Sequence, residues 1–183
     1  MSVVSTHLVA SLRSALSPDR VLTELEDILP YSFDGTAALK VKPGAVVFPH
    51  SGEEVSACVK LARTERVPVV TRGSGTGLSG GSVPIEGCLV ICVAQMDKIL
   101  EVDEKNLTLR AQCGAITKDI DDDANKVGLF YPPDPGSMKI STTGGNVPSR
   151  ACLRHDLTRA ASGSDGSRSG STPADPLLPH FSM

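Results

Sequence analysis

The chain has 183 residues, enough for one domain of ordinary size or two small ones. Apolar residues make up 40% and charged residues 21%, a typical globular composition, and the formal net charge is -3. With no Trp, 3% aromatic residues and an acidic balance, the chain lacks the stacking platforms and basic surface that nucleic-acid binding uses. We expect no transmembrane segment, because no run of about 18 apolar residues occurs, and no secretory signal peptide.

The first 36 residues are expected to form two short helices and a loop. Apolar residues recur at helical spacing on both sides of Ser17-Pro18-Asp19, which is typical of an N-cap followed by a first helical turn. The loop covers residues 30–36. The apolar residues in question are Leu8, Leu12, Leu16, Val21, Leu22, Leu25, Ile28 and Leu29.

Strands and helices alternate further along the chain. Ser51 and Glu54 have capping-box spacing and predict the start of a helix over about 53–66, and Thr117 predicts the start of another over 117–127. Strands are predicted at Ala45–Phe48, Val67–Thr71, Cys88–Val93, Ile99–Val102 and Leu107–Gln112.

The last 36 residues, 148–183, depart from this pattern. They contain seven Ser, four Pro and four Arg, and no Val, Ile, Lys or Glu. Such a composition buries too little apolar surface to offset the entropy of ordering the chain. Two interpretations stay open: a disordered C-terminal tail, or a shift of the reading frame near Val147.

The cysteines suggest neither a disulfide framework nor a zinc site, because their number is odd and no pair has CxxC spacing. We interpret them as small buried apolar residues in a reducing compartment, and we therefore expect a cytoplasmic location. They are Cys58, Cys88, Cys92, Cys113 and Cys152.

A glycine-rich segment directly follows the predicted strand Val67–Thr71. Glycine permits positive φ angles and lets backbone N–H groups approach a ligand closely. Consecutive N–H groups that point the same way form a nest for an anion such as phosphate, and Arg72 adds positive charge nearby. The glycines are Gly73, Gly75, Gly77, Gly80 and Gly81.

Known phosphate-binding motifs fit this segment poorly. A Walker A loop is excluded, because Ser82-Val-Pro-Ile follows the last glycine and no Lys is present. The spacing Gly75-Thr-Gly-Leu-Ser-Gly80 matches a Rossmann fingerprint, but Pro84 and Gly87 oppose the helix that this motif must begin. Two alternatives remain: a loop that binds a pyrophosphate with backbone donors alone, or a glycine-rich turn without a ligand.

A second cluster of Gly, Ser and Thr, at Tyr131–Ser137 and Ser141–Val147, completes a recognisable pair. Together with Pro68–Gly81 it resembles the FAD-linked oxidases related to vanillyl-alcohol oxidase and p-cresol methylhydroxylase (PCMH). Within that family the chain is most similar to the glycolate oxidase FAD subunit and to FAD-linked D-lactate dehydrogenases. Residues of this branch also occur at Tyr31–Asp34 and Val47–Ser51, so the resemblance covers roughly residues 25–147.

The resemblance implies an α+β fold, a PCMH-type FAD-binding domain with its first subdomain and the start of the second. It implies that the backbone amides of residues 72–77 hold the pyrophosphate and that the second cluster contacts FAD nearer the flavin. The implied cofactor-binding residues are Arg72, Gly73, Ser74, Gly75, Thr76, Gly77, Ser79, Gly80, Gly81, Asp134, Pro135, Gly136, Ser137, Thr142, Thr143, Gly144, Gly145 and Asn146.

The family's chemistry is the oxidation of a 2-hydroxy acid, with hydride transfer to flavin N5. Its electron acceptors include oxygen, quinones and partner iron–sulfur subunits, and the sequence does not select among them. The family pattern stops at Val147, so we expect a truncation or frameshift there, with the general base and the substrate-binding groups in the missing part. We therefore name no catalytic residue and no metal ligand, and we expect weak FAD binding without turnover.

These expectations divide the chain into three parts: an N-terminal helical segment (1–36), an incomplete FAD-binding domain (37–147) and the tail (148–183). Two alternatives to the FAD-binding portion of an oxidoreductase stay open. One is a non-catalytic nucleotide-binding or interaction module, and the other is an unstable pseudogene product.

Overall fold

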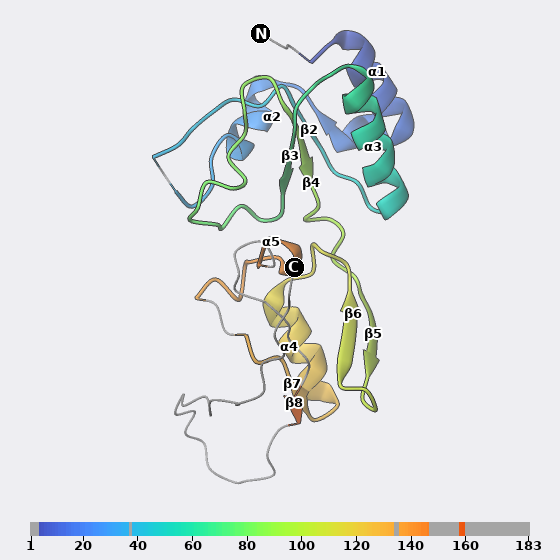
Figure 1. Cartoon of the computed structure of the whole chain (residues 1–183), viewed down its shortest axis with the longest axis vertical. Helices are drawn as coiled ribbons and strands as arrows, with labels where there is room; N and C mark the ends of the chain where they lie inside the picture. The colour runs from blue at the N-terminus through green and yellow to red at the C-terminus, as the bar shows by residue number, and fades with distance from the viewer. Residues whose placement is uncertain (1–3, 37, 134–135, 147–157, 160–183) are drawn as a thin grey trace, which may run out of the picture.

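Short apolar strands form the centre of the N-terminal lobe. The computed structural model describes residues 4–36, 38–133, 136–146 and 158–159, which form an N-terminal lobe (4–96) and a C-terminal lobe (97–159) (Figure 1). In the first lobe the sheet order is β1-β2-β4-β3, where β2 (Ala45–Val47), β3 (Val69–Arg72) and β4 (Leu89–Cys92) are parallel. Strand β1 (Val21–Leu22) pairs antiparallel with β2.

Helices cover both faces of this sheet, which explains why β2 and β4 are apolar at every position. Successive side chains of a strand point to opposite faces. Val47 and Ile91 pack against α1 (Thr6–Ala15) and α3 (Gly52–Thr64). Val46 and Val90 pack on the other side with α2 (Leu25–Ile28) and the 3-10 helix η2 (Leu29–Tyr31).

The expected capping box at α3 is confirmed, since the Ser51 hydroxyl accepts a hydrogen bond from Glu54 N. The expectation of a second N-terminal helix is wrong before Leu25. Pro18–Arg20 forms a 3-10 turn (η1) and Val21–Leu22 forms β1. Val21 pairs with Val47 and is buried in the core, so sheet pairing outweighs the local helical spacing.

The C-terminal lobe contains a β-hairpin with a helix packed against it. Strands β5 (Ile99–Asp103) and β6 (Thr108–Ala111) pair antiparallel, and α4 (Thr117–Lys126) contacts both. A small core around Ala124 and Leu129 joins these elements. The remaining elements are β7 (Leu129–Phe130), which pairs antiparallel with β8 (Thr158–Arg159), and the short helix α5 (Thr143–Asn146).

Most of the expected tail lies outside the described residues, and β8 is the part of it that the structure describes. Among the described residues, no helix combines the length and the apolar character needed to cross a bilayer.

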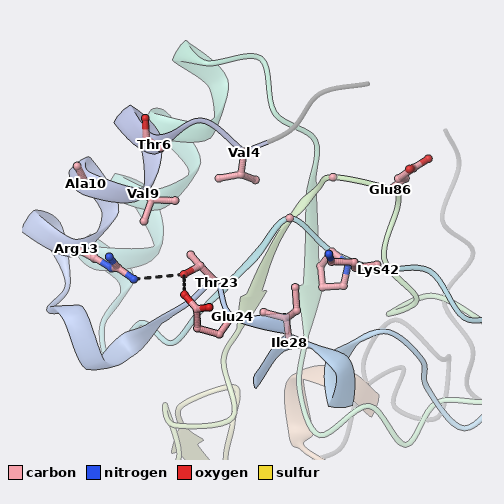
Figure 2. Close-up of a pocket in the computed structure, with 13 residues that line it drawn as sticks. Val4, Thr6, Val9, Ala10, Arg13, Thr23, Glu24, Ile28, Lys42 and Glu86 are labelled. Carbon is pink, nitrogen blue, oxygen red and sulfur yellow. Dashed lines mark hydrogen bonds between the residues drawn. The ribbon is translucent and has the colours of Figure 1, made fainter. Parts of the chain in front are cut away.

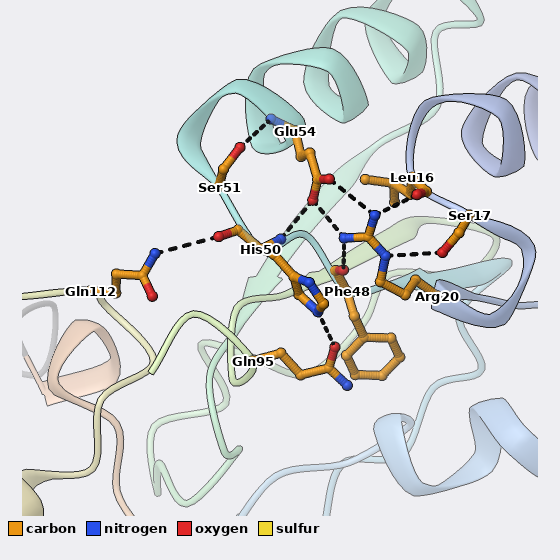
Figure 3. A network of polar contacts seen from close by, with 9 residues as sticks. All are labelled: Leu16, Ser17, Arg20, Phe48, His50, Ser51, Glu54, Gln95 and Gln112. Atoms are coloured by element: carbon orange, nitrogen blue, oxygen red, sulfur yellow. Dashed lines mark hydrogen bonds and ion pairs between the residues drawn. The ribbon is translucent and has the colours of Figure 1, made fainter. Parts of the chain in front are cut away.

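A network of polar contacts surrounds the turn before α3, and one of its hydrogen bonds joins the two lobes (Figure 3). Arg20 binds both carboxylate oxygens of Glu54, at 2.7 and 3.0 Å, and the His50 amide donates to the same carboxylate. His50 Nε2 donates to Gln95 Oε1 at 2.7 Å, because that amide oxygen can only accept. Gln112, at the end of β6, donates to the His50 carbonyl at 3.4 Å. The turn before α3 is thus tied to the C-terminal lobe.

Candidate functional site

The glycine-rich loop lies at the carboxyl edge of the parallel strands, directly after β3. In open sheets of parallel strands, this edge is where ligands bind. Residues 33–36 support the loop from the side: the amide of Gly80 donates to Thr36 Oγ1 at 3.0 Å. A Cβ built on Gly35 would lie 2.9 Å from the carbonyl oxygen of Gly77, so the two backbones are in close contact.

Five consecutive backbone amides of this loop are unused. The N–H groups of residues 73–77 donate to no other group in the described part of the chain. Gly75 and Gly80 have φ angles of +74° and +71°, which only glycine adopts without strain. A row of unused N–H groups on a loop with positive φ angles is the arrangement that binds anions.

The side chain of Arg72 lies behind this loop. Arg72 is the last residue of β3, is 8% exposed, and donates through Nη1 to the Phe33 carbonyl at 2.5 Å. Its guanidinium lies 5.5 Å from the ring centroid of Tyr31. Burial lowers the pKa of Arg72, because the charged form loses hydration.

The second cluster meets the loop at one point. A Cβ built on Gly73 would overlap Thr142 Oγ1, and it would lie 3.1 Å from Thr142 Cβ. Thr142 is 2% exposed, and its Oγ1 has no hydrogen-bond partner among the described residues. Buried hydroxyl groups without a hydrogen-bond partner are rare in folded proteins, and a bound ligand that accepts the hydrogen bond is one explanation.

Other residues of the second cluster are held by the turn before α4. The amide and the hydroxyl of Thr143 both donate to the Ala115 carbonyl at 2.9 Å, and the amide of Gly144 donates to the Cys113 carbonyl. Asn146 Nδ2 donates to Thr117 Oγ1 at 2.7 Å. These polar groups shape the turn that presents Thr142, and a direct role for them in binding stays a prediction.

The remaining predicted site residues belong to the glycine-rich loop and to the second cluster. Ser74, Ser79, Gly81 and Gly136 are exposed, and the Ser137 carbonyl accepts from the amides of residues 140 and 141. Asp134 and Pro135 lie outside the described residues.

Residues 31–36 belong to the site, although the sequence indicated only a family likeness there. Asp34 is buried and accepts from the amide of Thr36 at 2.8 Å and from the Ser82 hydroxyl at 3.5 Å. Burial acts to raise the pKa of Asp34, but these hydrogen bonds outweigh it and keep the pKa below the ordinary value. The ionised Asp34 therefore connects the segment 33–36 with Ser82, just after the glycine-rich loop. The one sequence signal was a short polar and aromatic segment that had no role in any predicted helix or strand.

Two other features do not contribute to this site. A cavity of about 760 Å³ is lined in part by Gly44 and Gly87, just before β2 and β4, and so lies at the opposite edge of the sheet (Figure 2). In the described part of the chain, no three His, Cys, Asp or Glu side chains gather to hold a metal ion.

An α+β chain that presents unused amides at the carboxyl edge of its sheet, faced by a buried hydroxyl from a second lobe, fits a protein that binds a nucleotide through its phosphates. The comparison with protein families makes this specific. A family model described as "FAD binding domain" matches residues 43–158, more than half of the chain. The chain belongs to this family, and its cofactor is FAD. The match extends beyond Val147, where the family pattern was expected to stop.

Known relatives agree with this assignment. The chain is 50% identical over 119 residues to glycolate oxidase subunit GlcD of Bacillus subtilis, covering 65% of this chain and 25% of that protein. It is 42% identical over 137 residues to D-lactate dehydrogenase of Anaerostipes hadrus, covering 74% and 29%. The structure of p-cresol methylhydroxylase shares the fold, with a TM-score of 0.68, 22% identity, and coverage of 77% and 28%.

The expected family, the PCMH-type fold and the FAD cofactor are thereby confirmed. The matched region spans between 25% and 32% of the length of the glycolate oxidase relatives.

Proposed function

We propose that this chain is the FAD-binding part of an oxidoreductase that oxidises a 2-hydroxy acid of the glycolate or D-lactate type. The relatives that carry these names support the substrate class. Bound FAD supplies a flavin N5 that accepts a hydride from the carbon bearing the hydroxyl group. The contribution of this chain, centred on residues 37–147, is to hold and orient that cofactor.

One observation supports the proposed binding mode: Thr142 Oγ1 is buried and unpartnered next to Gly73, the first of the residues with unused amides. A diphosphate offers several acceptor oxygens, so one group can satisfy both the amides and the hydroxyl. In this mode the amides of residues 73–77 would hold the diphosphate from the N-terminal lobe. Thr142 Oγ1 would hold it from the C-terminal lobe, so both lobes would contribute to the cofactor site.

The groups that bind the substrate carboxylate and take its hydroxyl proton belong, in this proposal, outside the described residues. Of the histidines that the structure describes, His7 binds Glu65 and His50 binds Gln95, so both hold the scaffold. The chain alone would therefore bind FAD without turnover. Electrons would pass on to a separate acceptor, such as an iron–sulfur subunit; the relative named as a glycolate oxidase subunit supports a multi-subunit assembly.

We place the protein in the cytoplasm on a separate observation. Cys58, Cys88, Cys92 and Cys113 are free thiols. Thiols of this kind persist in a reducing compartment.

The substitution Thr142→Val tests the binding mode. Valine keeps the β-branched shape and removes the hydroxyl, so the FAD-free chain should be as stable as wild type or more stable. The loss of a hydrogen bond to a charged group costs about 1.5–3 kcal/mol, so the FAD dissociation constant should rise roughly tenfold to hundredfold. The assay is titration of flavin fluorescence with the full chain, and Thr142→Ser, which keeps the hydroxyl, is the control.

Two results would contradict the proposal. If the wild-type chain does not bind FAD, the proposed function is wrong. If wild type and Thr142→Val bind FAD with equal affinity, the proposed binding mode is wrong. Anaerobic addition of glycolate or D-lactate to the FAD-loaded chain should leave the flavin oxidised. Rapid bleaching of its visible absorbance would show that the chain itself carries the substrate-binding groups.

A further inference from the structure

Arg72 is a buried cation that forms no ion pair among the described residues, although the ionised Asp34 attracts it from beyond ion-pair distance. It is 8% exposed, and among the described residues no carboxylate forms an ion pair with it. Its partners are a neutral carbonyl, that of Phe33, and the ring of Tyr31. A buried charge without an opposite charge is costly, so folded proteins normally pair it or use it.

The charge lies against the middle of the glycine loop. A Cβ built on Gly75 would overlap the guanidinium of Arg72 and would lie 2.8 Å from its Nε. Gly75 is the central residue of the five whose amides are unused. The guanidinium therefore lies against the backbone of the residues with unused amides, and its positive charge favours an anion bound at this loop.

Tyr31 keeps the guanidinium in this place. Its ring lies under Arg72, and it packs edge-on against Phe48 with the ring centroids 5.6 Å apart. Phe48 is buried, so the ring of Tyr31 has a fixed support. Burial raises the pKa of Tyr31 above its ordinary value, so the phenol is neutral at physiological pH and offers Arg72 no negative charge. The Phe33 carbonyl fixes the other side of the guanidinium through one hydrogen bond.

We propose that Arg72 is the counter-charge of the FAD diphosphate, that it acts from behind the Gly75 backbone and not by direct contact, and that Tyr31 is the residue that positions it. This inference rests on the proposed function, because the anion it requires is the diphosphate of FAD. It adds a role for the side chain, distinct from the role of the backbone amides. It also explains why position 75 has no room for a side chain, since any Cβ would displace the charge.

The test compares three variants of the full chain by FAD titration and by urea unfolding without FAD. Arg72→Met removes the charge and keeps the apolar stem, Arg72→Lys keeps the charge, and Arg110→Met removes a charge from an exposed side chain on the hairpin. Arg72→Met should weaken FAD binding by about tenfold to hundredfold, because the charge acts through a medium of low dielectric constant. Without FAD it should unfold at the wild-type urea midpoint or above it, since it loses a buried charge that forms no ion pair. Arg72→Lys should recover most of the affinity, and Arg110→Met should bind like wild type.

The outcomes separate this inference from the proposed function. If wild type does not bind FAD, both are overturned. If wild type binds FAD and Arg72→Met binds equally well, or no worse than Arg110→Met, only the role of Arg72 is overturned. If Arg72→Met and Arg72→Lys lose the same affinity and both unfold at lower urea concentration, Arg72 serves packing alone and the proposal is wrong.

Discussion

The substitution Gly73→Ala tests the contact on which the two-lobe site depends. The added Cβ would overlap Thr142 Oγ1 and would lie 3.1 and 3.3 Å from Thr142 Cβ and Cγ2. The φ angle of Gly73 lies outside the left-handed region, so the backbone accepts alanine and the cost is steric. Overpacking of this kind costs about 1–3 kcal/mol. Relief of the overlap must move Thr142 away from the loop, so the affinity for FAD should fall together with the stability.

A double-mutant cycle with Thr142→Ala isolates this contact. Thr142→Ala removes the hydroxyl and the methyl group and leaves a Cβ at a tight but tolerable distance from the new alanine. The cost of Gly73→Ala should therefore be smaller in the Thr142→Ala background, with a coupling energy of about 1 kcal/mol or more. Gly52→Ala is the control, because a Cβ there meets nothing within 4 Å and the position is in α3, where alanine is favoured.

Urea unfolding followed by circular dichroism measures the stability term, since the chain has no Trp to report by fluorescence. Flavin titration measures the affinity. If Gly73→Ala proves as stable as wild type, or if the two substitutions are strictly additive, the close approach of Gly73 and Thr142 does not exist in solution, and the bridging of the lobes by the cofactor loses its structural basis.

Two further predictions concern the scaffold. The Arg20 hydrogen bonds hold the pKa of Glu54 below its ordinary 4.5, so the stability that Glu54 adds is complete above that pH and is lost as the pH falls through the lowered pKa. Urea unfolding over a pH series should show that wild type loses its stability advantage over Glu54→Gln in this window. A stability difference that does not depend on pH would contradict this prediction. A thiol reagent at mildly alkaline pH should label Cys113 well before Cys58, because Cys58 is buried and burial raises its pKa to about 11. Peptide mapping after brief exposure to the reagent identifies the labelled residue. Equal labelling of the two cysteines would show that Cys58 is not buried in solution.

The parts of the fold that the sequence predicted well depend on local signals. The Ser51 cap, the helix α4 and the apolar strand β4 each have their signal within a few residues. The position of the glycine loop was also predictable, because five glycines within nine residues disfavour a helix or a strand and permit the positive φ angles of a tight loop.

The parts that could not be predicted depend on partners far away in the chain. Val21 has helical spacing with its neighbours, yet it forms a strand because Val47 offers a pairing edge. The sequence predicted that Arg72 lies near a bound phosphate, but only the fold shows that its guanidinium lies over the ring of Tyr31 and against Gly75. Likewise, no local pattern indicates that Thr142 lies against Gly73, because that contact exists only after both lobes have formed.

The distribution of unsatisfied polar groups connects stability with function in this molecule. Elsewhere in the described chain, several charged groups form ion pairs, such as Arg20 with Glu54 and Lys126 with Asp123. Where the lobes meet, the amides of residues 73–77 and the hydroxyl of Thr142 make no hydrogen bond to the described residues, and Arg72 forms no ion pair with them. The buried hydroxyl of Thr142 and the buried charge of Arg72 raise the free energy of the FAD-free fold, and in the proposed binding mode one dianionic ligand satisfies them together with the amides. Binding of that ligand would stabilise the folded chain by mass action, so in this proposal the features that make the free site costly are the ones that give it affinity for FAD.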